Sequence, residues 1–268
     1  MKKIFKYILI VCVFLSGTAF ILNKDKTLFT IQTPFNLFTS DNLSNSYFIK
    51  GEEIIKFNPA GKQLVKYSNK RFGKVTCIDA TNALKVLLYY KDFQQLVFLD
   101  NQLSQNGEAI SLENLGYEQT DLVCSSFNNS FWIYNKQGNE LLRFNENSKQ
   151  IAKTGNLKQL LQADLKPDFM IEHNSFLYLN CPAIGIYVFD MYGTFNKIIS
   201  LKNLPAFLVS DNIIYYYKDT KLCSYDTKAF EEKCISYNDT LLKNIRLEKD
   251  RLFLQYKDSV KVIENLVK

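Results

Sequence analysis

The chain has 268 residues, of which 47% are hydrophobic and 14% aromatic, and its formal net charge is +6. This length suits one large domain, and no Pro-, Gly- or Ser-rich tract indicates a linker that would divide it. The modest charge and the lack of a known nucleic-acid-binding module argue against nucleic acid as a partner.

The first residues have the pattern of a secretory signal peptide. Lys2 and Lys3 precede an apolar run over residues 7–15, and the small residues at 16–19 allow cleavage after Ala19. The alternative is an uncleaved membrane anchor over residues 7–22, which is shorter than the roughly 20 apolar residues that cross a bilayer. Both interpretations place residues 27–268 outside the cytoplasm, in the periplasm, secreted, or attached to the inner membrane.

A short motif recurs along the rest of the chain: an apolar strand that ends in an apolar residue followed by Asp, Asn or Glu. The copies lie 36 to 45 residues apart, at Asn58, Asp100, Asn145, Asp190, Asp226 and Glu264. A second series of apolar, β-prone segments precedes them, such as KVLLYYKD before Asp100 and FWIYNKQ before Asn145. Two aligned series with a period of about 40 residues are typical of a β-propeller with one four-stranded blade per period. The sequence therefore predicts an all-β, six-bladed β-propeller over residues 27–268.

The last repeat supplies only three strands, beginning near Asn244. The β-prone segment at residues 27–32 precedes the first blade and has no other place in the pattern. We expect it to pair with the strand at residues 259–263 and to complete the last blade, because this closes the ring and covers an open strand edge.

The innermost strand of each blade, strand A, is recognised by the polar residue at its end. These residues are Asn42, Asn82, Asn128, Asn174, Asn212 and Asp250. Asn and Asp tolerate the left-handed turn conformation, which would explain why they recur.

Residues 185–201, GIYVFDMYGTFNKIISL, are the clearest copy of the repeat. Their core, IYVFDMYGTFNKII, resembles the NHL repeat, and residues 27–268 as a whole resemble the six-bladed propellers of the NHL and TolB-like group. The resemblance implies a binding or scaffolding module, or else a hydrolase or lactonase with a metal in its channel, and the fold alone does not choose between them.

Three carboxylates occupy comparable places in the A strands of alternate blades: Asp79, Glu172 and Glu248. The matching places in the other blades hold Ser40, Ser126 and Ser210. Carboxylates that converge on the channel could bind calcium or another divalent cation. The alternative is that no cofactor binds and that these residues are solvated strand ends in a wet channel.

Other reactive or aromatic residues have structural interpretations. His173 is the only histidine and no G-x-S-x-G motif accompanies it, so we predict a turn residue and assign no catalytic residue. Trp132 lies within a predicted B strand, where packing between blades is the ordinary role of an aromatic residue. Cys77, Cys124 and Cys181 are expected to be buried thiols.

A disulfide is predicted between Cys223 and Cys234. If residues 227–230 form a four-residue turn, Asp226 faces Glu231 and the two cysteines face each other across adjacent antiparallel strands. An oxidising compartment would allow the bond to form. The alternative is a pair of free thiols.

The turns between the second and third strands, B and C, carry a lysine in five of six blades. These residues are Lys50, Lys91, Lys136, Lys218 and Lys257. Turns are polar in any case, but a ring of lysines on one face would also attract an acidic partner.

The sequence leaves two functions open. One is a non-catalytic binding or scaffold propeller of the bacterial cell envelope that engages a protein or glycan through one loop face, where the lysine turns favour an acidic partner. The other is a metal-dependent hydrolase or lactonase with a site in the channel. If residues 7–22 anchor the chain, the strand order predicts that the lysine turns point away from the membrane.

Overall fold

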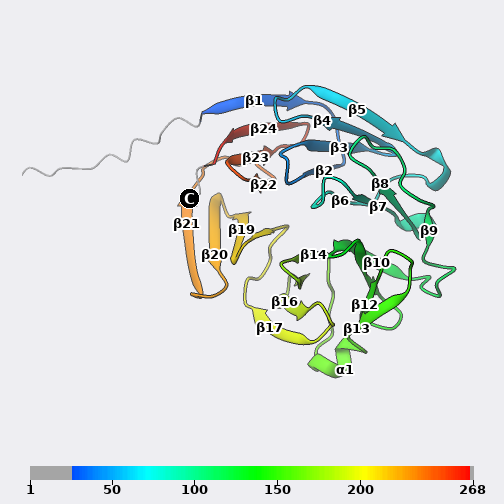
Figure 1. Cartoon of the computed structure of the whole chain (residues 1–268). Coiled ribbons are helices and arrows are strands. Elements are labelled where there is room, and N and C mark those ends of the chain that lie inside the picture. The colour runs from blue at the N-terminus through cyan, green and yellow to red at the C-terminus, as the bar shows by residue number, and fades with distance from the viewer. Residues whose placement is uncertain (1–25, 266–268) are drawn as a thin grey trace, which may run out of the picture.

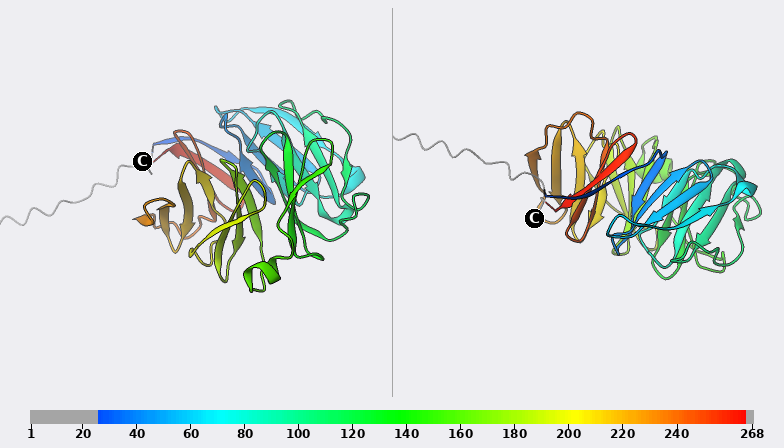
Figure 2. Two further views of the ribbon diagram at one scale, coloured as in Figure 1. Left: turned by 60° about the horizontal axis from the view of Figure 1, so that its bottom comes forward. Right: turned by 90° about the horizontal axis from the view of Figure 1, so that it is seen from above.

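The computed structural model describes residues 26–265, so the signal peptide over residues 1–19 and the anchor over residues 7–22 lie outside the described residues. Within the described part, six four-stranded sheets stand side by side around a central axis (Figure 1). The predicted six-bladed β-propeller is confirmed. The edge-on view, on the right of Figure 2, shows the blades in a single layer. No helix within residues 26–265 is long and apolar enough to cross a membrane.

Each blade contains strands A to D, in order from the channel outwards. Blade 1 consists of β2 (Leu37–Ser40), β3 (Ser46–Lys50), β4 (Glu53–Phe57) and β5 (Gln63–Ser68). Blade 2 consists of β6 (Cys77–Asp79), β7 (Val86–Tyr90), β8 (Gln95–Leu99) and β9 (Ile110–Ser111). Blade 3 consists of β10 (Thr120–Ser126), β11 (Ser130–Asn135), β12 (Glu140–Phe144) and β13 (Gln150–Lys153).

Blade 4 consists of β14 (Phe169–His173), β15 (Phe176–Cys181), β16 (Gly185–Asp190) and β17 (Phe195–Ile199). Blade 5 consists of β18 (Leu208–Ser210), β19 (Ile213–Lys218), β20 (Lys221–Asp226) and β21 (Glu231–Ser236). Blade 6 consists of β22 (Asn244–Glu248), β23 (Arg251–Gln255), β24 (Ser259–Glu264) and β1 (Thr27–Gln32). A short helix, α1 (Leu157–Leu161), lies between blades 3 and 4, and one-turn helices follow β5 and β7.

The alternating strand direction gives the propeller two faces. The B–C turns and the D–A connections between blades lie on one face, which we call the B–C face. The A–B and C–D turns lie on the opposite face, the A–B face. Strand β1 begins on the A–B face, because Thr27 pairs with Ile263 near the end of β24.

The N-terminal strand completes the last blade, as predicted. β1 pairs antiparallel with β24, with Ile31 opposite Val260, and the two strands lie side by side in Figure 1. Ile31 is buried in a cluster with Phe48 of blade 1 and Phe253 of blade 6. The strand therefore closes the ring both through its hydrogen-bond ladder and through its packing.

The recurring Asp or Asn of the repeat closes the C–D turn. Asp190 Oδ1 accepts hydrogen bonds from the backbone N–H groups of Tyr192 and Thr194 at 2.9 and 2.8 Å. The same pair of bonds forms at Asn58, Asp100 and Asn145. These turns require a short side chain with an acceptor oxygen, which explains the motif. Glu264 closes no such turn because the outer strand of blade 6 comes from the N-terminus; its carboxylate pairs with Lys26 instead, at 2.6 Å.

The same turns also join neighbouring blades. A cation of one blade donates a hydrogen bond to the main-chain oxygen of the residue that follows the recurring Asp or Asn in the next blade. Among residues 26–265 this contact links Lys56 to Asn101, Arg143 to Met191, Lys197 to Thr227 and Arg251 to Pro59. One motif therefore supports both the turn and the contact between blades.

The A–B turns differ in part from expectation. Of the six aligned polar residues, only Asn128 and Asn174 have a positive φ, 56° and 48°. In blades 5 and 6 the left-handed residue is one position earlier, at Asp211 and Lys249. Blade 2 uses a longer turn over residues 80–85. The explanation from left-handed turns was therefore wrong for four blades. In blades 5 and 6 the preceding residue takes the left-handed conformation, in blade 1 Ser44 does, and no residue of the blade 2 turn has a positive φ.

Strands B and C pack between blades and are largely apolar. All residues of β7 and β11 are buried. Trp132 is 0% exposed and lies in a cluster that joins blades 2, 3 and 4. Trp132 is thus part of the core between blades and offers no surface for a ligand.

Candidate functional site

A cavity with a volume of about 410 Å³ lies at the centre of the propeller. It is lined from all six blades at or near the start of strand A, by residues that include Leu37, Ile78, Leu122, Met170, Phe207 and Ile245. Because every A strand starts at a D–A connection, this cavity opens on the B–C face. A smaller space of about 30 Å³ continues deeper into the channel beside Asp79.

The wall of the central cavity is mainly apolar, and four charged side chains also line it: Lys91, Asp121, Asp168 and Arg246. Phe169 and Phe207 meet edge to face there, with ring centres 5.2 Å apart. Asp168 lies at the mouth, where its Oδ1 accepts a hydrogen bond from Asn180 at 2.8 Å. Burial raises the pKa of Asp168, and the hydrogen bond from Asn180 partly offsets this. Arg246 lines both the cavity and the deeper space. Such an apolar cavity with a few convergent polar groups is the usual form of a binding site.

The five lysines proposed for partner binding all lie at B–C turns, but their surroundings differ. Lys91 and Lys136 both reach Asp121, at 2.7 and 3.6 Å. Lys218 donates to the main-chain oxygen of Lys202 at 2.9 Å. Lys50 and Lys257 have exposed side chains and no ion pair within residues 26–265. Asp121 therefore neutralises part of the positive charge expected on this face.

The three carboxylates proposed as metal ligands do not meet in the channel. Asp79 Oδ2 accepts from the backbone N–H of Ser125 in blade 3, at 2.8 Å. Glu172 is 8% exposed and turns toward blade 3. Glu248 accepts from Ser40 of blade 1 at 2.7 Å, and burial raises its pKa. In the described part of the chain, no three His, Cys, Asp or Glu residues lie close enough to hold a metal ion.

Glu172 accepts three hydrogen bonds, all of them from blade 3. Its carboxylate accepts hydrogen bonds from Ser126 Oγ at 2.5 Å, from the backbone N–H of Phe127 at 2.9 Å and from Trp132 Nε1 at 2.6 Å. Arg143 donates to the same Ser126 hydroxyl at 2.7 Å. Glu172 thus connects blade 4 to the core of blade 3.

His173 and Cys77 are half-buried, whereas Cys124 and Cys181 are buried; the three cysteines are the free thiols of residues 26–265. The pKa of His173 is lowered by burial, which the charge of Asp211 opposes. Its Nε2 is buried without a hydrogen-bond partner among residues 26–265. Burial raises the pKa of Cys77 and Cys181 to about 12, so both thiols remain protonated at neutral pH. Protonated thiols are poor nucleophiles.

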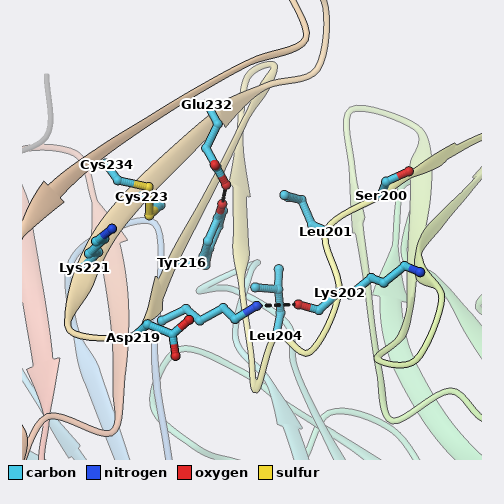
Figure 3. Close-up of a pocket in the computed structure, with 11 residues that line it drawn as sticks. Ser200, Leu201, Lys202, Leu204, Tyr216, Asp219, Lys221, Cys223, Glu232 and Cys234 are labelled. Carbon is cyan, nitrogen blue, oxygen red and sulfur yellow. Dashed lines mark hydrogen bonds between the residues drawn. A yellow bond between two sulfur atoms is a disulfide. The ribbon is translucent and has the colours of Figure 1, made fainter.

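A second cavity, also of about 410 Å³, lies between blades 4 and 5 (Figure 3). The D–A connection at residues 200–204 and the B–C turn at residues 218–221 form two of its sides, and Lys218 reaches Lys202 across it. Tyr216 donates a hydrogen bond to Glu232 on the side formed by β21. The second cavity therefore opens beside the B–C face, as the central cavity does, and we call it the groove between blades 4 and 5.

A disulfide between Cys223 and Cys234 forms part of that groove. β20 and β21 pair in the predicted register, with Asp226 opposite Glu231 and Cys223 opposite Cys234. All residues of β21 are exposed, so the bond ties an outer strand with little packing of its own to the buried part of the blade.

Loss of this bond is expected to lower the free energy of unfolding by about 2–3 kcal/mol, because the closed loop is short. The double variant Cys223→Ala/Cys234→Ala should melt below the parent, and the reduced parent should melt like the variant. Mass spectrometry of non-reduced peptides from the native compartment provides the direct check. Free alkylation of both thiols there would show that the bond is absent from the protein.

Sequence reasoning missed Arg246 and Asp168. A signal for Arg246 was present, because it lies two residues before Glu248 in one strand and so shares its face. Asp168 precedes β14 in a D–A connection, where no periodic pattern marks the direction of a side chain.

No family model and no curated protein matches the chain. Solved structures with the same architecture do match. The chain is similar to virginiamycin B lyase from Staphylococcus aureus, with a TM-score of 0.57 and 11% identity over 85% of this chain and 80% of that one. It is also similar to a gluconolactonase from Xanthomonas campestris, with a TM-score of 0.62 and 10% identity over 89% and 88%.

A propeller in the Mitotic Checkpoint Complex gives a TM-score of 0.62 with 7% identity, over 90% of this chain and 95% of that one. The likeness is one of fold. At these identities it supports the β-propeller and does not single out the NHL or TolB-like group.

Proposed function

We propose that this propeller is a non-catalytic binding module of the bacterial cell envelope, which engages a protein or glycan through its B–C face. The observation that carries the proposal is the central cavity, which is lined by all six blades and opens on that face. The groove between blades 4 and 5 and the exposed Lys50 and Lys257 lie on the same side. A protein partner is in keeping with the similar propeller from the Mitotic Checkpoint Complex.

The chain direction supports the same face. β1 begins on the A–B face, so a chain held in a membrane through residues 7–22 would enter the disc from that side. Only four residues, 23–26, separate the apolar run from β1, and they span at most about 14 Å when extended. The B–C face would then point away from the bilayer and toward a partner.

The alternative is a metal-dependent hydrolase or lactonase with calcium or another divalent cation in the channel. This alternative is in keeping with the similar gluconolactonase. The positions of Asp79, Glu172 and Glu248 favour a structural role, because each carboxylate accepts hydrogen bonds from a neighbouring blade. Calorimetric titration with calcium, manganese and zinc distinguishes the two functions, since saturable binding that Asp79→Asn abolishes would support the enzyme.

Reversal of charge at the lysine turns should weaken partner capture. The triple variant Lys50→Glu/Lys218→Glu/Lys257→Glu is expected to bind the partner from envelope extract at least about tenfold more weakly, since charged patches steer association. Capture by the parent should also fall as salt rises from low to physiological concentration. The melting temperature should stay within about 2 °C of the parent, because surface substitutions cost little stability.

A matched control reverses three exposed lysines of C–D turns on the other face, in the variant Lys62→Glu/Lys149→Glu/Lys228→Glu. It should capture the partner like the parent. Equal capture by the two triple variants would show that the B–C face is not the binding surface.

A further inference from the structure

Arg246 is the unusual residue of the central cavity. It lies in the middle of β22, and its side chain is 18% exposed. Its Nε and Nη2 atoms make only long contacts with Ser40, at 3.5 and 3.4 Å, and Nη2 lies 3.9 Å from Glu248 Oε1. Nη1 has no hydrogen-bond partner within residues 26–265. A largely buried guanidinium normally has its donors satisfied, so Arg246 retains capacity for an acceptor.

The carboxylates near Arg246 are already engaged. Glu248 accepts a shorter bond from Ser40 than it shares with Arg246, 2.7 Å against 3.9 Å. Asp121 at the mouth is paired with Lys91 and Lys136. Asp79, beneath the cavity, accepts from Thr81 and from the backbone N–H of Ser125. Burial raises the pKa of Glu248 and of Asp168.

The space above Arg246 has mainly apolar walls, with Lys91, Asp121 and Asp168 also lining it, and is of the size of a small molecule. Phe38, Phe169, Met170 and Phe207 are among its walls, and its volume is about 410 Å³. Pockets of about 300–1,000 Å³ bury most of a small ligand's surface. An occupant thus meets apolar walls on several sides and two cations, of which Lys91 is paired with Asp121 whereas Arg246 makes only long contacts.

We infer that the central cavity binds an organic acid with an apolar body, whose carboxylate is received by Arg246. The planar guanidinium can donate two parallel hydrogen bonds to a carboxylate, and the phenylalanine walls take up the apolar part. This inference rests on the proposed function of the B–C face and names the chemistry of its ligand. The same chemistry is presented by a free aromatic or aliphatic acid and by the C-terminal residue of a peptide.

The test compares 1-naphthylacetate with 1-naphthylacetamide, which share the aromatic body and differ in charge. Isothermal titration calorimetry is carried out on the full chain as it is isolated from cells. The acid should bind at least about tenfold more tightly than the amide, because a hydrogen bond to a charged group contributes more than a neutral one. Arg246→Gln should weaken the acid about 10- to 100-fold and leave the amide unchanged. Equal binding of acid and amide by the parent, or an unchanged acid affinity in Arg246→Gln, would overturn the inference.

Three controls separate the site from other effects. Arg246→Lys keeps the charge and should retain part of the preference for the acid. Lys70→Gln removes an exposed cation of the D–A connection between blades 1 and 2, on the same face but outside the cavity, and should change neither affinity. Ala206→Trp narrows the cavity and should weaken both probes, with melting curves recorded to confirm that each variant folds.

A further arm identifies the source of the acid. A hexapeptide ending in phenylalanine with a free carboxylate is compared with its C-terminal amide and with 1-naphthylacetate. Tighter binding of the free peptide than of the naphthyl acid assigns the site to a peptide C-terminus, and weaker binding assigns it to a free acid. If the acid binds and Lys50→Glu/Lys218→Glu/Lys257→Glu still captures the partner, the inference stands and the proposed function fails. If the acid does not bind and this variant loses the partner, the proposed function stands and the inference fails.

Discussion

Deletion of residues 20–33 is expected to lower the melting temperature by roughly 10 °C or more. The deletion removes β1, exposes the edge of β24 and leaves the cluster of Ile31, Phe48 and Phe253 without one of its members. Loss of a buried isoleucine and of a whole strand ladder costs several kcal/mol, and an open edge also favours association between chains. Differential scanning calorimetry and size-exclusion chromatography measure the two effects.

The matched control deletes residues 20–25 alone, which lie before the first described residue and outside β1. It should melt like the parent chain. If the longer deletion also melts like the parent, ring closure by β1 contributes little to stability and the proposed role of the strand is refuted.

Glu172→Ala is expected to lower the free energy of unfolding by about 3–5 kcal/mol, as for other buried charges whose partners remain behind. Its removal leaves three donors in the core between blades 3 and 4 without their acceptor: Ser126, the Phe127 N–H group and Trp132 Nε1. For a domain of this size the melting temperature should fall by about 6–12 °C. Trp132 is the only tryptophan, so its fluorescence reports the same contact and should change as well.

Two variants control for this result. Glu172→Gln keeps the shape and one acceptor oxygen and should cost less than Glu172→Ala. Glu113→Ala removes an exposed carboxylate from the same disc and should change the melting temperature by no more than about 2 °C. A Glu172→Ala protein as stable as Glu113→Ala would mean that the carboxylate is not a support for the core.

The sequence was sufficient for the fold because the repeat has a local cause. Asp190 and its counterparts are restricted to short acceptor side chains by the turns they close, so the repeat is visible without an alignment. Ring closure followed from a count of strands. The pairing of Cys223 with Cys234 followed from the length of one turn, since register in a hairpin is set by its turn.

The site was less accessible from sequence because it depends on contacts between blades. The alternation of a strand shows which residues share a face, but a carboxylate on that face can turn to the channel or to the next blade. Glu172 turns to Trp132, which lies 40 residues earlier, and no local pattern indicates this contact. The cavity itself is formed by side chains from six separate strands, so its size and its apolar walls emerge only in three dimensions.

The central claim, that the B–C face is the binding face, can be tested directly by photo-crosslinking in cells. Leu241, which is 71% exposed in the last D–A connection, and Leu84, which is 64% exposed in an A–B turn, form a matched pair on opposite faces. Each is replaced in turn by a photoreactive amino acid in the otherwise unchanged chain. We expect a discrete partner adduct from position 241 that disappears with Lys50→Glu/Lys218→Glu/Lys257→Glu, and none from position 84. A partner adduct from position 84 alone would contradict it.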